Sequence, residues 1–268
     1  MTGIVPQIID DISCYAPAFL KESSHFPKEN FKDLYGCEQG HFWFEARNQL
    51  IFYCMQKYLS VSLRPKILEV GCGTGFVLEG LAQKFPGYDL SGTELYLEGL
   101  RFAKLRSPHL TFFQADARDL PFSDTYDAIG AFDVVEHIEE DVDTLKSFYK
   151  ALKPGGLLFL SVPQHMWLWS QQDEMSCHKR RYTRKELKNK LRACGFVLRD
   201  TTSFVSLLLP LMALSRLKRK TRADLEEIKI SGFLNAFLMA IMKVEMLIIK
   251  CGISLPMGGS LFCVAEKR

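Results

Sequence analysis

The sequence has 268 residues, of which 47% are hydrophobic and 24% are charged, a composition that excludes a disordered chain and favours one globular, catalytic-size domain. The formal net charge of +3 is too small to indicate binding to nucleic acid, and we expect no nucleic-acid partner. The eight cysteines form no CxxC pair, which excludes a zinc ribbon and a disulfide framework and favours reduced thiols in the cytoplasm.

The amino-terminal segment contains Asp10 and Asp11 and lacks a basic start followed by an apolar run, so we expect no secretory signal. No segment reaches about 18 uninterrupted apolar residues, so we expect no membrane span either. Residues 31–60 have a helical pattern and carry a cluster of aromatic side chains at 41–44. We predict that residues 1–60 form a helical prefix whose aromatic side chains either cover the cofactor or anchor the helix to the sheet.

From residue 66 onward, short apolar segments alternate with helical segments, a pattern typical of a parallel sheet with helices on both faces. The predicted strands are 66–70, 88–93, 110–114, 126–132, 157–162, 196–202 and 260–265. The predicted helices between the first five are 75–85, 95–106 and 141–152, the last ending at a turn at 153–156. We therefore predict an α/β fold with a doubly wound, seven-stranded, mostly parallel sheet, built from residues 61–204 and 258–268.

Thr183 and Glu186 predict a capping box at the start of a helix that continues to Cys194 and ends at Gly195. Residues 205–257 form a predicted helical insert before the last strand. The basic run 216–222 follows an apolar stretch, so residues 205–222 suit peripheral contact with an anionic membrane, with a solvated helix face as the alternative. The apolar helix predicted at 233–249 suits a cover over the acceptor pocket or a dimer interface, and the oligomeric state stays open.

Three glycines, Gly71, Gly73 and Gly75, follow an apolar strand and precede a helix, so the backbone can turn tightly and a ligand can approach it. A turn of this kind binds nucleotides, although similar glycine spacings also serve NAD or the packing of a helix on a strand. Glu94 ends the second strand about twenty residues later, where a carboxylate can accept hydrogen bonds from both hydroxyls of an adenosine ribose. Asp116 follows the third strand, so three strand ends place glycines and acids at one crevice.

Residues 66–204 resemble the class I S-adenosylmethionine-dependent methyltransferases, which have a Rossmann-like fold. The segments that carry the resemblance are LEVGCGTG at 68–75, GTE at 92–94, QADA at 114–117, FDVVEH at 132–137 and KPGG at 153–156. A dinucleotide dehydrogenase usually has a GxGxxG pattern. The later glycine of that pattern is missing after Gly75, which favours a methyl donor over NAD. The resemblance implies S-adenosyl-L-methionine as the cofactor, S-adenosyl-L-homocysteine as the product, and no metal.

The resemblance also implies a set of cofactor-binding residues at the strand ends. They are Glu69, Gly71, Cys72, Gly73, Glu94, Leu95, Asp116, Ala117 and Phe132. In this set Glu69 would orient the methionyl amine, Glu94 would hold the ribose, and Asp116 would lie at the adenine. Arg47 lies three residues after Phe44, on the same helical face, where a guanidinium can meet the methionyl carboxylate.

Methyl transfer from a sulfonium is an in-line displacement, so the protein must mainly align the nucleophile and exclude water. His137 follows the fourth strand and is the candidate catalytic base for a hydroxyl acceptor; alternatively, it caps the strand end or contacts the cofactor. A polar cluster after the fifth strand suits a phosphate or carboxylate, or else a solvated surface. Its candidate substrate-binding residues are His165, His178, Arg181 and Tyr182. A metal site at His165, Asp173 and His178 lacks a recognised spacing.

The sequence therefore predicts an enzyme that transfers a methyl group from S-adenosylmethionine to a small or lipid- or glycan-linked acceptor, with oxygen as the favoured atom. A non-catalytic adenosyl-binding regulator and an NAD-dependent oxidoreductase are the alternatives. We expect a cytoplasmic protein, with membrane association through the insert. The sequence does not indicate which acceptor is methylated.

Overall fold

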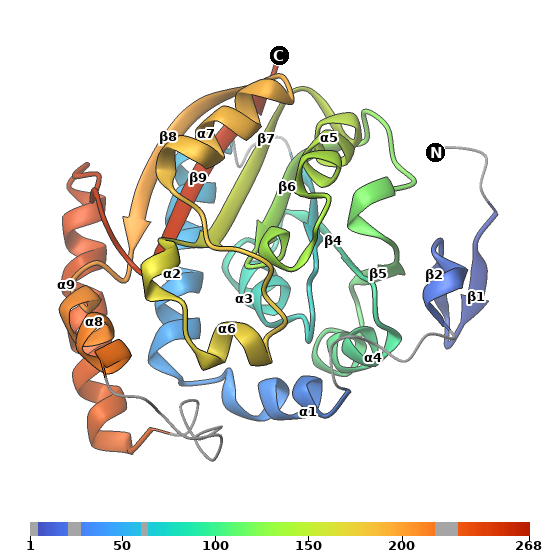
Figure 1. Ribbon diagram of the computed structural model, residues 1–268. Coiled ribbons are helices and arrows are strands. Elements are labelled where there is room, and N and C mark those ends of the chain that lie inside the picture. The colour runs from blue at the N-terminus through green and yellow to red at the C-terminus, as the bar shows by residue number, and fades with distance from the viewer. Residues whose placement is uncertain (1–4, 21–27, 60–63, 218–229) are drawn as a thin grey trace.

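The computed structural model describes residues 5–20, 28–59, 64–217 and 230–268. These residues form one mixed sheet in the strand order β1-β2-β5-β4-β3-β6-β7-β9-β8 (Figure 1). The central parallel strands are β3 (Lys66–Val70), β4 (Asp89–Glu94), β5 (Thr111–Gln114), β6 (Tyr126–Phe132) and β7 (Leu152–Pro163). At one edge, β9 (Ser260–Lys267) runs antiparallel between β7 and β8 (Phe196–Phe204).

Helices cover both faces of the sheet. Buried side chains of α2 (Phe42–Tyr58), α3 (Phe76–Lys84), α4 (Leu97–Arg106) and α9 (Gly232–Lys250) belong to one hydrophobic cluster. Those of α5 (Asp141–Ala151) and α7 (Arg184–Ala193) belong to a second cluster. The remaining helices are α1 (Lys28–Cys37), α6 (Gln171–Met175) and α8 (Leu209–Leu217). The result is the three-layer architecture that alternating strands and helices produce.

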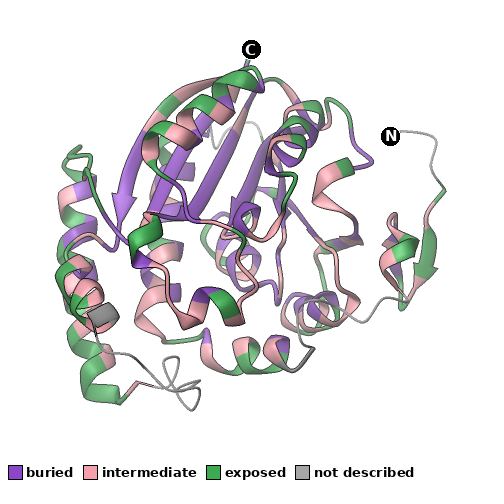
Figure 2. Ribbon diagram, in the orientation of Figure 1, coloured by how far each residue is buried: buried purple, intermediate pink, exposed green. Residues whose placement is uncertain are grey.

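The strands are apolar on both faces because both faces are covered. Ile67 and Leu68, neighbours on β3, point to opposite faces and belong to the two different clusters, and neither is exposed. The same holds for Phe159 and Leu160 on β7. Burying one side chain of this size contributes about 1.5–3 kcal/mol relative to exposing it. Figure 2 shows the buried strands at the centre of the molecule.

All seven predicted strands are present, so the predicted fold class is confirmed, with small shifts at the strand ends. The count of seven is low, because β1 (Gln7–Ile9) and β2 (Ile12–Cys14) add a hairpin whose second strand pairs with β5. Strands of three residues are too short to show an alternating pattern. The segment 153–156 is not a separate turn either: β7 begins at Leu152 and includes it, with an irregular register against β6.

The helical pattern predicted at 31–60 corresponds to two helices, α1 and α2. Helix α1 ends at Cys37, and the chain changes direction through Gly40, whose φ of +77° is a left-handed conformation that glycine adopts without strain. Nδ1 of His41 then accepts a hydrogen bond from the backbone N–H of Trp43 at 3.3 Å and caps α2. After the break the two helices run in different directions: in Figure 1, α1 lies across the bottom of the view, whereas α2 runs upward.

The insert before the last strand is helical where it is described. Helix α9 packs against α2, and Asn235 joins them: its Oδ1 accepts from the N–H of Phe42 and its Nδ2 donates to the carbonyl of Gly40, both at 2.8 Å. By length and composition α9 is the one helix in the described part of the chain that qualifies as a membrane span, as some core helices also do. The predicted basic run lies mostly outside the described residues, since 218–229 are not part of them.

Candidate functional site

A cavity of about 1120 Å³ lies at the carboxyl ends of β3, β4, β5 and β6. This is the edge at which open parallel sheets bind ligands. Its other walls come from the prefix and the insert, through residues such as Trp43 on α2, Met212 on α8 and Leu238 on α9. Ligand pockets usually measure roughly 300–1000 Å³, so this cavity can hold a nucleotide-sized cofactor together with a second molecule.

The glycine turn forms the floor of the cavity between β3 and α3. Gly71, Gly73 and Gly75 have φ values of +68°, +52° and +79°, which are left-handed and favour glycine. A Cβ at Gly71 would lie 2.5 Å from Cγ2 of Val134, so no larger residue fits there. A Cβ at Gly73 would meet no atom within 4 Å, and that open space belongs to the cavity. The turn therefore exposes backbone to a ligand.

Glu69 lies at the end of β3 and lines the cavity, although the side chain is almost completely buried. Its Oε2 has no hydrogen-bond partner among the described residues. Burial raises the pKa of Glu69 to about 8, and the nearby positive charge of Arg47 opposes this shift. A buried carboxylate without a partner is unfavourable unless a cation or donor meets it. This environment fits a bound ammonium group, such as the methionyl amine.

Glu94 is held in position by backbone groups. Its Oε1 accepts hydrogen bonds from the N–H groups of Leu95 at 2.7 Å and Tyr96 at 3.2 Å, and its Oε2 accepts from Gly73 at 3.2 Å. Burial raises the pKa of Glu94, and these three donors oppose the shift. The carboxylate therefore bridges the glycine turn and the end of β4 and lines the cavity, and its contact with a ribose stays a prediction.

Asp116 and Ala117 also line the cavity, after β5. The carboxylate of Asp116 is engaged by Arg118, with Nη2 at 2.7 Å from Oδ2, and it caps a short helix through the N–H of Arg118. Arg118 in turn contacts Glu140 at 3.2 Å. Arg118 therefore holds Asp116 in the cavity wall. If Asp116 binds adenine as predicted, its carboxylate would contact adenine and Arg118 at the same time.

Arg47 extends from α2 into the cavity wall. Its Nη1 donates to Oδ2 of Asp133 at 2.8 Å, and its guanidinium lies over the rings of Trp43 and Phe44, 4.6 and 5.6 Å from their centroids. Phe132, at the end of β6, lines the same cavity. The aromatic cluster of the prefix thus anchors α2 through buried Phe44 and also lines the cavity, whereas a role in covering the cofactor stays a prediction.

Glu136, His137 and His178 lie close together in the wall of the cavity. The rings of His137 and His178 are edge to face, with centroids 4.6 Å apart. Burial and the charge of His178 lower the pKa of His137 to about 4, so His137 is neutral at pH 7 and is a weak base. Burial raises the pKa of the fully buried Glu136 well above its ordinary value. His137 as catalytic base stays a prediction, and its environment does not favour it.

The four predicted substrate-binding residues separate into two pairs. His178 and the largely buried Arg181 line the cavity, and both contact Asp173. His165 and Tyr182 do not line it. His165 stacks on Trp167, whereas Tyr182 is fully buried and its hydroxyl donates to Asp141 at 2.8 Å. We therefore correct the expectation for these two residues, because Tyr182 joins two elements of the core and His165 lies outside the cavity wall.

Two sets of cavity residues were not among the predicted site residues. Glu38, between α1 and α2, accepts from Thr74 Oγ1 at 2.6 Å and from Arg106 at 2.8 Å, which ties the prefix to the glycine turn. The second set comes from the insert: Val205, Leu208, Leu211, Met212 and Leu238. No local pattern marks Glu38, since its contacts join segments far apart in the chain. For the insert, the apolar pattern at 233–249 predicted a cover over the acceptor pocket or a dimer interface, but it did not identify the individual lining side chains.

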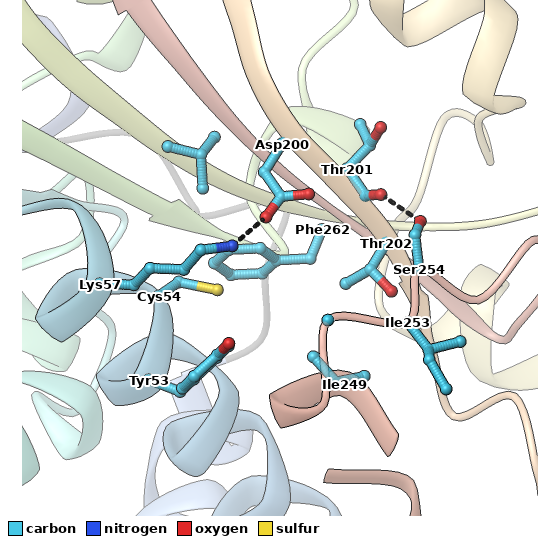
Figure 3. Close-up of a pocket in the computed structure, with 12 residues that line it drawn as sticks. Tyr53, Cys54, Lys57, Asp200, Thr201, Thr202, Ile249, Ile253, Ser254 and Phe262 are labelled. Atoms are coloured by element: carbon cyan, nitrogen blue, oxygen red, sulfur yellow. Dashed lines mark hydrogen bonds and ion pairs between the residues drawn. The ribbon is translucent and has the colours of Figure 1, made fainter. Parts of the chain in front are cut away.

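A second, separate pocket of about 40 Å³ lies between α2, α9 and β8 (Figure 3). Its lining residues include Asp200, which accepts a hydrogen bond from Lys57 at 3.0 Å, and Ser254, which donates to the carbonyl of Thr201 at 2.6 Å. A space of this size holds little more than one water molecule. It shares no lining residue with the large cavity, so we assign the candidate site to the large one.

A family model described as methyltransferase domain matches residues 35–201 of the chain. The match covers more than half of the sequence and includes the glycine turn, Glu94, Asp116 and Glu136. The chain therefore belongs to the class I S-adenosylmethionine-dependent methyltransferases. The cofactor of this family is S-adenosyl-L-methionine, and the environments of Glu69 and Glu94 fit its amine and ribose.

Two curated relatives are methyltransferases of quinone biosynthesis. The chain is 33% identical over 109 residues to demethylmenaquinone methyltransferase of Chlorobaculum tepidum, a match that covers 40% of this chain and 45% of the relative. It is 31% identical over 103 residues to ubiquinone biosynthesis O-methyltransferase of Aliivibrio fischeri, covering 36% and 43%. The matched segment spans less than half the length of each of these relatives.

Solved structures share the fold. A methyltransferase in complex with the Haloferax volcanii Trm112 activator superimposes with a TM-score of 0.60 at 19% identity, covering 88% of this chain and 96% of that one. Phosphoethanolamine N-methyltransferase 2 of Haemonchus contortus, solved with S-adenosyl-L-methionine, gives 0.55 at 17% identity, covering 81% and 51%. At these identities the likeness concerns the fold alone.

Proposed function

We propose that this protein transfers the methyl group of S-adenosyl-L-methionine to an oxygen atom of a small-molecule acceptor. The observation that carries the proposal is the grouping of Glu69, Glu94 and the glycine turn around one cavity that extends beyond the space a cofactor needs. The quinone methyltransferases among the relatives act on small molecules and support an acceptor of that class.

The chain's own residues divide the work of holding the donor. Glu69 accepts a hydrogen bond from the methionyl amine, and Glu94 accepts hydrogen bonds from the ribose hydroxyls. Arg47 offers an Nε without a hydrogen-bond partner among the described residues to the methionyl carboxylate. When bound, the cofactor supplies a sulfonium methyl that is transferred by in-line displacement. The aromatic side chains of α2 cover this region and exclude water, which favours a displacement that mainly requires alignment.

The acceptor that we favour carries a lipid or a lipid-linked glycan. The proposed acceptor side of the cavity is walled by apolar residues of α8 and α9, among them Leu211, Met212 and Leu238. The same helices carry apolar side chains on their outer surface, including Phe233 at 86% and Phe237 at 53% exposure. An apolar tail could therefore pass from a membrane surface into the cavity along these helices.

This arrangement also supports the proposal that residues 205–222 make peripheral contact with a membrane while the protein is otherwise cytoplasmic. The described part of this segment is apolar and partly exposed, as at Leu207 and Leu214. The basic run that follows it in the sequence suits anionic headgroups, at about 1 kcal/mol per cation near the surface.

The test is methyl transfer from radiolabelled S-adenosylmethionine to separate aqueous and organic extracts of cells. We expect label in an organic-soluble product that mass spectrometry identifies by a gain of one methyl group. Label confined to the aqueous fraction would overturn the lipid-linked acceptor but leave the small-molecule acceptor. Tight cofactor binding without transfer to either extract would favour a non-catalytic adenosyl-binding regulator instead.

A further inference from the structure

Glu136 occupies an unusual position for an acidic residue. It is 0% exposed, lies in the wall of the large cavity, and neither Oε1 nor Oε2 has a hydrogen-bond partner among the residues that the structure describes. Leaving a buried carboxylate unpaired is costly, and proteins usually pair such a group or place it on a metal ion. The methyl donor does not explain this residue, because Glu69 already accounts for its amine.

Two histidines lie next to this carboxylate. One potential ligand atom from each of Glu136, His137 and His178 lies within 4.8 Å of the other two. Ligand atoms around a tetrahedral zinc ion are about 3.3 Å apart, as bond lengths near 2.0 Å require. Binding an ion would therefore require the three side chains to draw closer together.

His178 is already oriented for ligation. Its Nδ1 lies 2.9 Å from Oδ1 of Asp173, a side chain that is only 1% exposed. Asp173 is itself fixed by two hydrogen bonds from Arg181, at 2.7 and 2.9 Å, and one from the N–H of Ser170 at 2.8 Å. A carboxylate that binds one imidazole nitrogen leaves the other for a metal, and this pairing recurs behind metal-bound histidines.

We propose that Glu136, His137 and His178 bind one divalent transition-metal ion, with Asp173 as the positioning residue and an open coordination position toward the cavity. Two imidazoles and one carboxylate are a ligand set of mononuclear zinc and non-haem iron sites. The proposal replaces the sequence-based expectation of no metal. It also differs from the earlier set of His165, Asp173 and His178, since His165 lies elsewhere and Asp173 is turned toward Arg181.

The ion would act on the acceptor, a role that rests on the proposed function. An acceptor oxygen on the open position would lose its proton to water more readily, because a metal stabilises the resulting anion. The new oxygen–carbon bond would form as the sulfur–carbon bond breaks, leaving neutral S-adenosylhomocysteine. The metal takes no part in donor binding, so the two sites can be tested separately.

The test is calorimetric titration of untagged, chelator-treated protein with Zn²⁺ and with Co²⁺, the latter followed by its absorption spectrum. We expect one ion per chain, which Glu136→Gln and His178→Ala each remove. Asp173→Asn should weaken binding by about 10- to 100-fold, as the loss of an orienting carboxylate does. His165→Ala is the matched control and should bind as the wild type does, since His165 is outside the cavity.

Donor binding serves as the folding control for every variant. One result would overturn the metal site: the wild type and the Glu136→Gln/His178→Ala double variant bind the metal equally, and both bind S-adenosylmethionine. The absence of metal binding in a wild type that binds the donor would do the same. Metal binding in a protein that does not bind the donor would support the metal site and overturn the proposed methyl transfer.

Discussion

Arg47, on the second helix of the prefix, donates a hydrogen bond to Asp133 at 2.8 Å, and the two side chains are only 12% and 18% exposed. Asp133 follows β6, so this ion pair fixes the prefix against the sheet at the edge of the cavity. It also holds a positive charge close to the buried Glu69, whose pKa it lowers against the effect of burial. Residues 35–201, which match the family model, therefore include the part of the prefix that completes the site.

Replacing Arg47 by methionine should weaken donor binding by about tenfold or more and destabilise the protein by about 1–3 kcal/mol, because a largely buried Asp133 loses its partner. Denaturant unfolding and calorimetry measure the two effects. Arg101→Met is the control: its partner Asp10 is 54% exposed, and such surface pairs contribute about 0–1 kcal/mol. Equal effects of the two substitutions would contradict the role given to Arg47.

Glu69→Gln should abolish most donor binding while changing how the stability of the cofactor-free protein depends on pH. The pKa of Glu69 rises from 4.5 to about 8 on folding, so between these values the folded protein holds a proton that the unfolded chain has released. The contribution of Glu69 to the free energy of unfolding is therefore fully present below pH 4.5 and is lost as the pH rises to about 8. Between pH 5 and pH 9, the thermal unfolding temperature should therefore fall less in Glu69→Gln than in the wild type. An unchanged pH profile would contradict the buried, unpaired state of this carboxyl group.

Gly71→Ala should both destabilise the fold and remove donor binding. The added methyl group would lie 2.5 Å from Val134, and the φ of +68° is strained for alanine, so we expect a loss of about 1–3 kcal/mol. Gly87→Ala is the matched control, since nothing lies within 4 Å of its added Cβ, and its stability should change by less than about 0.5 kcal/mol. Normal donor binding by Gly71→Ala would show that the turn does not contact the cofactor.

Phe233→Ser together with Phe237→Ser should reduce sedimentation with vesicles that contain anionic lipid, because both rings are exposed on α9. Neutral vesicles should bind the wild type less, since the basic residues contribute only with anionic headgroups. Leu105→Ser is the control, as this exposed side chain lies on α4. Self-association measured by ultracentrifugation, without binding to vesicles, would instead assign this surface to a dimer interface.

The sheet was predictable because short, mostly apolar segments alternate regularly with helical segments from residue 66 onward. Thr183 caps α7 as expected and accepts from the N–H of Glu186. The hairpin of β1 and β2 was not predictable, because its pairing with β5 depends on Gln114, whose side chain bonds both backbone groups of Ala16 at 3.0 Å. Such contacts join segments nearly a hundred residues apart and leave no local pattern.

The cofactor side of the site was predictable and the acceptor side was not. Glu69, Glu94 and the glycines lie at strand ends, and strand order fixes where such ends meet. Tyr182 and His178 lie in one short polar run, yet only His178 lines the cavity, because the direction of each side chain depends on the packing around Asp173 and Asp141. The apolar helix at 233–249 was expected to cover the pocket or to form a dimer interface, but which side chains of α8 and α9 line the cavity depends on tertiary packing.

Calorimetric titration with S-adenosylmethionine and S-adenosylhomocysteine tests the central claim most directly. We predict one site per chain for both ligands, a loss of binding in Glu94→Ala, and no heat from NAD, because the carboxylate of Glu94 and the open turn at Gly73 together form the donor site. Absence of binding by the wild type at roughly millimolar ligand, an affinity near −4 kcal/mol, would contradict the account. Binding of NAD that Glu94→Ala removes would contradict it equally.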